Sequence, residues 1–383
     1  MNSLIDILNK TMAVERLAGV SVYVLALTIV YFRIKKANIQ QIPRILRVYQ
    51  LVLCMMAFFY IPGIDADLTT WRTRSAAWMG YSPRDFLLTY AWDTSSPLSY
   101  TLMYLCRRSG IPGLLPMIAA FVFYQNTFHI LTETARRKNT PPNIVAVFLL
   151  FVMASGRFLE VISGIRCMMA FSIVVRLFFD EVFAEKKMIR HILFYIAACL
   201  IHPAAVAVTL IRLACFLMEG RNGWSKAYNM LLMAAAGVIM ATVGLGLWKK
   251  MMHSATRYLG YDVYSNLWEY LITALSLAVI ILYLIRYIRI RREATYETKK
   301  IVWFSVIFLV IEVCMVSTYT IFQRFAAINV LICPPYFEGI LSASPTRKQV
   351  FLLKTTKVIS LLMLFLACMR GNLSGYKFLL FHW

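Results

Sequence analysis

Residues 155–212, which read SGRFLEVISGIRCMMAFSIVVRLFFDEVFAEKKMIRHILFYIAACLIHPAAVAVTLIR, decide the fold of this chain. Two long apolar segments flank a short basic loop, a pattern that is typical of a membrane hairpin. Ionisable residues interrupt the apolar segments at Arg157, Glu160, Arg166, Arg176 and His202. Ionisable groups at membrane depth are costly and are tolerated mainly in a protein interior or a water-filled cavity. These residues are therefore candidates for function.

The composition extends the membrane interpretation to the whole chain. Of the 383 residues, 60% are hydrophobic and only 15% are charged, and long apolar runs recur along the sequence. Backbone groups in lipid must be satisfied within helices or closed barrels, and the runs lack the alternation of barrel strands. We therefore predict an all-α fold, a polytopic transmembrane helical bundle of about 10–12 spans. The predicted spans include apolar runs at about 48–61, 112–132, 143–160, 165–184 and 267–285. Residues 1–383 form a single integral membrane domain in this prediction.

The charge points to a membrane partner rather than to nucleic acid. The formal net charge is +22, but the Lys and Arg residues lie in short clusters between apolar runs. This distribution follows the positive-inside rule, and no basic stripe lies on a soluble domain. We expect membrane lipids or lipid phosphates to be the partners of these cations, and we expect no nucleic-acid binding.

The polar segment after the second apolar run is predicted to lie outside the membrane. The basic cluster after the first run places residues 33–47 in the cytoplasm, so the second run returns the chain to the outer side. An outer loop then covers about 62–111, and residues 62–97 contain four Asp and three Arg residues. Residues 98–106 are too short to cross a membrane, which predicts an interfacial helix.

Two basic loops create a topological problem. Residues 186–190 and 286–300 are both predicted to be cytoplasmic, but three apolar segments separate them. An odd number of crossings cannot return a chain to the same side. The segment at about 192–218 contains His202-Pro203, where a helix would break, so we predict that this segment is re-entrant. The alternative is that one of the loops violates the positive-inside rule.

Arginines near the outer ends of spans predict an anion site. Arg157, Arg166 and Arg324 all fall there in this topology. The guanidinium group is always charged, and its planar fork matches phosphate oxygens. Three such cations near one face suggest a diphosphate ligand. The alternative is that each arginine snorkels to the interface or pairs with Glu160 or Glu312.

His202 lies within ACLIHPAAV, and the following proline frees a carbonyl one turn back. At about 1.5 Å per residue from Arg190, His202 lies about 18 Å above the inner face, so it can share a substrate with Arg166. A structural histidine bonded to the freed carbonyl is the alternative interpretation.

The outer loop and the remaining histidines carry weaker signals. Asp65 and Asp67 could be a carboxylate pair that serves acid–base catalysis or binds a cation. The alternative is that they are ordinary turn residues beside Pro62-Gly63. The five histidines are scattered without ligand spacing, so we predict no metal site. A phosphate-binding loop of the GxxxxGK[ST] type is also absent from the sequence, and we predict no cofactor.

These segments together resemble a known family. SGIRCMMAFSI and AACLIHPAAV are similar to segments of the EpsG-like, Wzy-type bacterial polysaccharide polymerases, in which an Arg opens one span and a His lies in the next. GIDADLTTW resembles the family's Gly-x-Asp stretch, and QRFAAINVLICPPYF resembles its late Arg-containing segment before a proline. The chain departs from the family pattern at Cys167, where Gln is common, and at Trp71, near where Tyr is usual.

The resemblance implies a GT-C-type membrane glycosyltransferase in the cytoplasmic (inner) membrane of a bacterium. It would polymerise O-antigen, capsule or exopolysaccharide by transferring an undecaprenyl-diphosphate-linked glycan onto another lipid-linked repeat unit at the outer face. A chain-length regulator and a flippase are the implied protein partners. The expected catalytic residues are Arg166, which holds the diphosphate, and His202, as base or hydrogen-bond orienter. The expected substrate-binding residues are Arg157, Arg324, Asp65, Asp67 and Arg72.

Two other function classes remain open at the level of sequence. A transporter or flippase of lipid-linked oligosaccharides would bind the same ligands without reacting. Such proteins often contain two similar halves, and we find no internal repeat. An acyltransferase that modifies the glycan would use a His-Asp or His-Glu pair, which His202 lacks nearby in the sequence.

Overall fold

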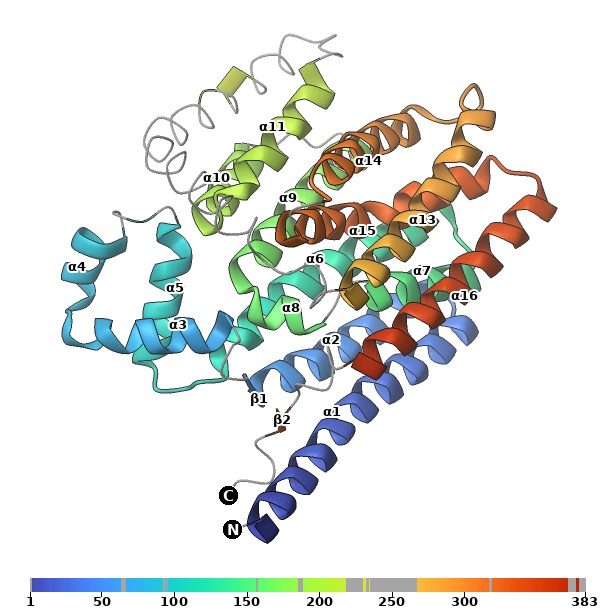
Figure 1. The fold of residues 1–383 in the computed structure, drawn as a ribbon. Coiled ribbons are helices and arrows are strands. Elements are labelled where there is room, and N and C mark those ends of the chain that lie inside the picture. The colour runs from blue at the N-terminus through green and yellow to red at the C-terminus, as the bar shows by residue number, and fades with distance from the viewer. Residues whose placement is uncertain are drawn as a thin grey trace.

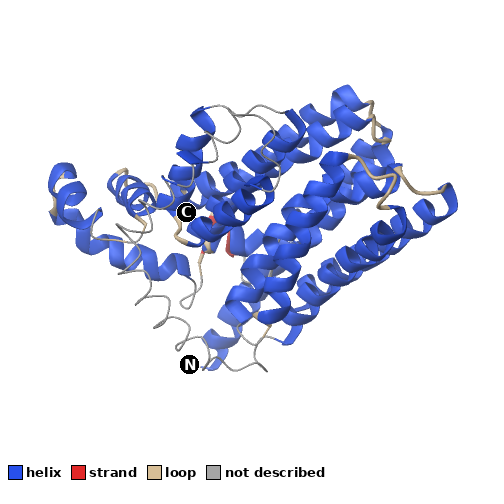
Figure 2. Ribbon diagram, turned by 90° about the horizontal axis from the view of Figure 1, so that it is seen from above, coloured by secondary structure: helices blue, strands red, loops and turns tan. Residues whose placement is uncertain are grey.

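The computed structural model describes residues 2–62, 67–91, 94, 96–155, 158–184, 189–217, 230–231, 234, 267–316, 319–370 and 377–378. The described part is almost wholly helical, as Figure 2 shows from above. The predicted all-α membrane bundle is therefore confirmed.

The chain begins with α1 (Asn2–Lys36), η1 (Ile39–Gln41) and α2 (Ile42–Phe58). The segment that we call the arm follows, with α3 (Asp67–Ala76), η2 (Ala77–Gly80), α4 (Pro83–Asp85), the π-helical η3 (Phe86–Ala91) and α5 (Pro97–Arg108). The middle of the bundle comprises α6 (Leu114–Lys138), α7 (Pro142–Ser155), α8 (Phe158–Ser163), α9 (Ile165–Ala184), α10 (Ile189–Ile201) and α11 (Ala204–Leu217). The last helices are α13 (Leu267–Ile290), α14 (Tyr296–Cys314), α15 (Tyr319–Ser342) and α16 (Thr346–Arg370). Two short strands, β1 (Tyr60–Ile61) and β2 (Lys377–Phe378), pair antiparallel.

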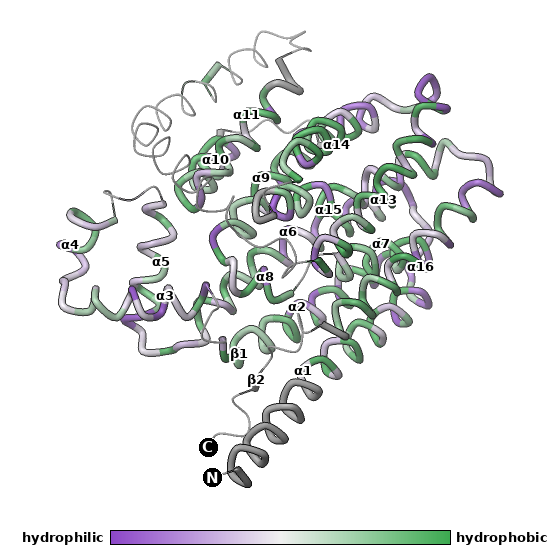
Figure 3. Tube along the Cα trace, in the orientation of Figure 1, coloured by the Kyte–Doolittle hydropathy of each residue, from purple (hydrophilic) through white to green (hydrophobic). Residues whose placement is uncertain are grey.

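Several helices are suited to a membrane. Within the described residues, four are long and apolar enough to cross one, namely Leu114–Lys138, Leu267–Ile290, Phe322–Ser342 and Thr346–Cys368. Shorter apolar helices cover Pro142–Ser155, Arg190–Ile201 and Ala204–Leu213. Figure 3 shows hydrophobic residues along the bundle helices and hydrophilic residues gathered at helix ends. The chain is therefore a multi-pass membrane protein, while the expected count of 10–12 spans stays a prediction.

The bundle has two distinct ends (Figure 1). One end of the bundle holds the connections between helices at 36–42, 138–142, 290–296 and 342–346. At this end, Arg286 Nε donates a hydrogen bond of 3.0 Å to Ser344 Oγ. We call this the basic end, because Lys and Arg residues flank these connections. At the opposite end, the arm end, Tyr270 donates to the carbonyl of Val316 at 3.1 Å and the arm stands beside the bundle. Figure 1 shows the arm in light blue to cyan, with α3, α4 and α5 projecting from the main body.

The helix break predicted at His202-Pro203 separates α10 from α11. The two helices run antiparallel, because the same side chain, Glu181, contacts Tyr195 of α10 and Arg212 of α11. His202 therefore occupies the tip of a helical hairpin. How this hairpin lies relative to a membrane stays a prediction.

Corners at the arm end are tight. The expected span at 143–160 is divided, since α7 ends at Ser155 and the short α8 follows from Phe158. At the corner between α8 and α9, a Cβ atom on Gly164 would overlap the carbonyl oxygen of Glu160. A side chain at this position would force the backbone of the preceding turn to shift, so glycine suits the corner that precedes the first turn of α9.

Candidate functional site

Arg166 lies in the first turn of α9, and the arm holds its guanidinium group. The Cζ atom of Arg166 lies 4.3 Å from the ring centroid of Trp71 on α3 and 6.0 Å from that of Tyr100 on α5. Its Nη1 atom donates a long hydrogen bond of 3.5 Å to Ser96 Oγ. Trp71 and Tyr100 meet edge to face, with their ring centroids 5.4 Å apart. Because an aromatic ring attracts a cation that lies over its face, these contacts orient the guanidinium plane.

Arg324 and His202 join Arg166 from two other elements. The charges of Arg166 and Arg324 lie close enough to act on each other and on His202. Phe171 of α9 links these elements, since its ring centroid lies 6.3 Å from that of His202 and 6.2 Å from that of Phe325. The structure therefore brings together three of the predicted site residues, from α9, α15 and the tip of the α10–α11 hairpin.

The ring of His202 is oriented by its own turn. The backbone N–H of Ala204 donates to Nδ1 of His202 at 3.2 Å. A nitrogen that accepts this bond carries no proton, so the proton of the neutral ring lies on Nε2. The free edge of His202 is therefore a hydrogen-bond donor. This geometry favours the orienting role over the role of a general base.

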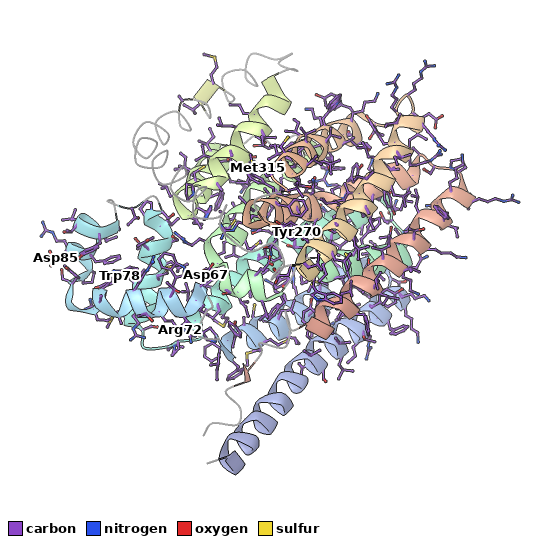
Figure 4. All side chains as sticks on the ribbon, viewed as in Figure 1. Asp67, Arg72, Trp78, Asp85, Tyr270 and Met315 are labelled. Carbon is purple, nitrogen blue, oxygen red and sulfur yellow. The ribbon has the colours of Figure 1, made fainter. Side chains whose placement is uncertain are left out.

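Asp67 lies at the end of the arm that is nearer the bundle, whereas Asp85 lies at the far end (Figure 4). The Asp67 side chain is exposed in the first turn of α3, and its charge acts on Arg166. A carboxylate in a first helical turn is stabilised by the helix dipole. The site thus combines two cations, one neutral donor and one carboxylate.

Arg72 is directed elsewhere in the arm. Its Nη2 atom donates to the carbonyl of Pro112 at 2.9 Å, which ties α3 to the start of α6. Burial lowers the pKa of the Arg72 guanidinium from its ordinary value, while nearby Tyr60 raises this pKa and nearby Arg107 lowers it. A role for Arg72 in substrate binding stays a prediction. Two other predicted site residues, Asp65 and Arg157, lie outside the described residues.

A buried ion pair fixes the hairpin that carries His202. Arg212 Nη2 and Nε lie 2.6 Å and 2.7 Å from Glu181 Oε2, and both side chains are fully buried. Tyr195 donates to the same carboxylate oxygen at 3.2 Å. Sequence reasoning missed this cluster because Glu181 and Arg212 are 31 positions apart. The one available signal was the presence of both charges in apolar segments.

Arg176, His129 and Glu312 each have a polar partner beside them in the bundle. Arg176 Nε lies 3.6 Å from Asp180 Oδ2, and its Nη1 atom donates to Asn126 Oδ1 at 3.1 Å. His129 Nε2 lies 2.9 Å from Asp180 Oδ1. Glu312 accepts a hydrogen bond of 2.6 Å from Asn329 Nδ2. Within the described residues, no group of three or more His, Cys, Asp or Glu side chains could hold a metal ion.

The core beside the site has little free volume. A cavity of about 20 Å³ lies between α8, α13 and α15 and is lined in part by Glu160, Thr273 and Gln323. This volume is about that of one water molecule. A sugar or a lipid does not fit in this cavity.

Comparison with known proteins identifies the family. The EpsG family model matches residues 77–379 of the 383-residue chain. The chain belongs to the EpsG family. This is a family of Wzy-like polysaccharide polymerases, so the resemblance predicted from the sequence is confirmed. No curated protein and no solved structure matches the chain.

The extent of the EpsG match divides the site in two. Arg166, His202 and Arg324 lie within the matched residues, whereas Asp67 and Trp71 precede them. The helices that bring the two cations and the histidine together are thus part of the family region. The first helix of the arm supplies the aromatic ring and the carboxylate from outside that region.

Proposed function

We propose that this EpsG-family protein transfers an undecaprenyl-diphosphate-linked glycan onto another lipid-linked repeat unit at the outer face of the bacterial cytoplasmic membrane. The family supports the general class, a glycosyltransferase-type polysaccharide polymerase. The observation that carries the proposal is the meeting of Arg166, Arg324 and His202 at the arm end of a membrane bundle. The product would be O-antigen, capsule or exopolysaccharide.

The two arginines suit a diphosphate leaving group. A lipid-linked sugar leaves behind a dianionic or more highly charged phosphate, which fixed cations stabilise as charge develops in the transition state. Trp71 and Tyr100 contact Arg166 through the ring faces, so the edge N–H groups of its guanidinium point to phosphate oxygens in this proposal. Arg324 adds a second charge from α15. His202 Nε2–H then donates a third contact to the same diphosphate.

Asp67 serves the acceptor in this proposal. Its exposed carboxylate accepts a hydrogen bond from the acceptor hydroxyl and takes up the proton during transfer. A bond forms between the acceptor oxygen and the anomeric carbon of the donor glycan. The bond between that carbon and the phosphate oxygen breaks, and undecaprenyl diphosphate leaves with the electron pair.

A deletion strain tests the function directly. Surface polysaccharide from the strain is separated on a gel, and plasmid copies of the gene restore either the wild type or an Arg166→Lys variant. Loss of a polymerase leaves single repeat units at the surface, and we expect the variant to leave the same pattern. Loss of a flippase or transporter would leave no repeats at the surface, and that result would contradict the proposal.

A further inference from the structure

An open groove lies at the basic end of α1 and α2, on the opposite side of the bundle from the Arg166 site. Its volume is about 700 Å³. The groove is lined by Thr28, Ile29, Phe32, Arg33, Lys36, Ala37, Gln41, Arg44 and Ile45. It therefore combines cationic and apolar side chains in one place.

The cations of the groove have no partners within the described part of the chain. Arg33, Lys36 and Arg44 form no hydrogen bond and no ion pair there. Gln41 fixes the corner between the helices, because its Oε1 atom accepts a hydrogen bond of 3.2 Å from the backbone N–H of Asn38. The amide nitrogen of Gln41 stays available as a donor. The groove thus presents three positive charges and a neutral donor to one ligand.

An apolar stripe leads into the groove along α1. Val22, Leu25, Ile29 and Phe32 follow the spacing of one helical face, and Ile29 and Phe32 are 51% and 52% exposed. Arg33 and Lys36 continue the same face at the end of the helix. At about 1.5 Å per residue, the stripe from Val22 to Arg33 extends about 16 Å, close to half the thickness of a bilayer core.

We propose that this groove binds an anionic glycerophospholipid. The order of side chains along α1 matches that of the lipid, with the acyl chains on the apolar stripe and the phosphate between Arg33, Lys36 and Arg44. Charge complementarity selects an anionic headgroup over a zwitterionic one, because three cations face the groove without acidic neighbours among its lining residues.

The test measures lipid binding to the purified, delipidated full-length protein in neutral detergent. Fluorescent phosphatidylglycerol is the probe, and fluorescent phosphatidylcholine is the zwitterionic control. Each cation removed should weaken phosphatidylglycerol binding about fivefold, so the variant with Arg33→Gln, Lys36→Gln and Arg44→Gln should bind roughly 100-fold more weakly. Phosphatidylcholine binding should change little. If the triple variant accumulates poorly, the single Arg33→Gln variant is measured instead, and it should bind phosphatidylglycerol about fivefold more weakly than the wild type.

The matched control removes three exposed cations elsewhere at the basic end. Arg289→Gln, Arg291→Gln and Arg292→Gln lower the net charge by the same amount outside the groove. We expect this variant to retain wild-type affinity for phosphatidylglycerol. Equal weakening in both triple variants would show a general surface potential and would overturn the proposal. Displacement of the lipid by millimolar inorganic phosphate would overturn the assignment to a phospholipid, as would tight binding of phosphatidylcholine.

Discussion

The buried pair between Glu181 and Arg212 should couple the stability of the bundle to the position of His202. Both side chains are fully buried, and their closest N–O distance is 2.6 Å. Removing one partner takes the nearest counter-charge away from a buried charge, which typically costs about 3–5 kcal/mol; His191 Nδ1 remains 3.7 Å from Glu181 Oε1. Removing both charges together leaves no such charge, and replacing a buried pair with apolar residues is often neutral. We therefore expect Glu181→Leu and Arg212→Met to be destabilising alone and nearly neutral in combination.

A double-mutant cycle measures this coupling. The free energy of unfolding is obtained by denaturant titration in mixed detergent micelles for the wild type, both single variants and the double variant. Because each single substitution should cost about 3–5 kcal/mol and the double variant almost nothing, we expect an interaction energy of about 6–10 kcal/mol in favour of the pair. Arg136→Met is the control, because the Arg136 side chain is 67% exposed and its pair with Glu133 should contribute less than about 1 kcal/mol. Additive effects of the two single substitutions would refute the reasoning.

Three further predictions concern the site. Trp71→Ala removes the ring over which Arg166 lies, so kcat/KM for polymerisation should fall about 2- to 30-fold, whereas Trp71→Phe should stay close to wild type. Equal activity of the two variants would show that the ring contact does not support activity. His202→Gln retains an N–H donor, so its polymerisation rate should stay within about tenfold of wild type and its pH profile should not change. His202→Phe loses a hydrogen bond to a charged group, so its rate should fall roughly 10- to 150-fold. A large loss of rate in His202→Gln would instead assign His202 the role of general base. Asp67→Asn should lower the rate about 10²-fold at unchanged protein level in the membrane, and a wild-type rate would remove Asp67 from proton transfer.

The helices of the bundle could be predicted from sequence because apolar length is a local property. The expected spans at 165–184 and 267–285 lie within α9 and α13, and the expected span at 112–132 begins two residues before α6. The break at His202-Pro203 was also predictable, because proline lacks the N–H that would continue the helix. Helix α2 begins earlier than the expected span, at Ile42, because a helix can continue beyond the apolar core into the basic interfacial region.

The arm and the contacts of the site could not be predicted in the same way. The stacking of Arg166 over Trp71 joins residues 95 positions apart through a segment without apolar periodicity. The protonated nitrogen of His202 depends on one backbone hydrogen bond at the turn. Residue types predicted that Arg166, Arg324 and His202 would serve one site, but only tertiary packing establishes their proximity.

The most direct test of the account is the rate of polymerisation by purified protein supplied with lipid-linked repeat units. The central claim is that Arg166 binds the diphosphate through its planar fork. Arg166→Lys keeps the charge and loses the fork, so the rate should fall about 10²–10³-fold. Arg74→Lys is the matched control, since Arg74 also lies over the Trp71 ring, at 5.2 Å, but is exposed on the arm. A wild-type rate in Arg166→Lys, or an equal loss in Arg74→Lys, would contradict the account.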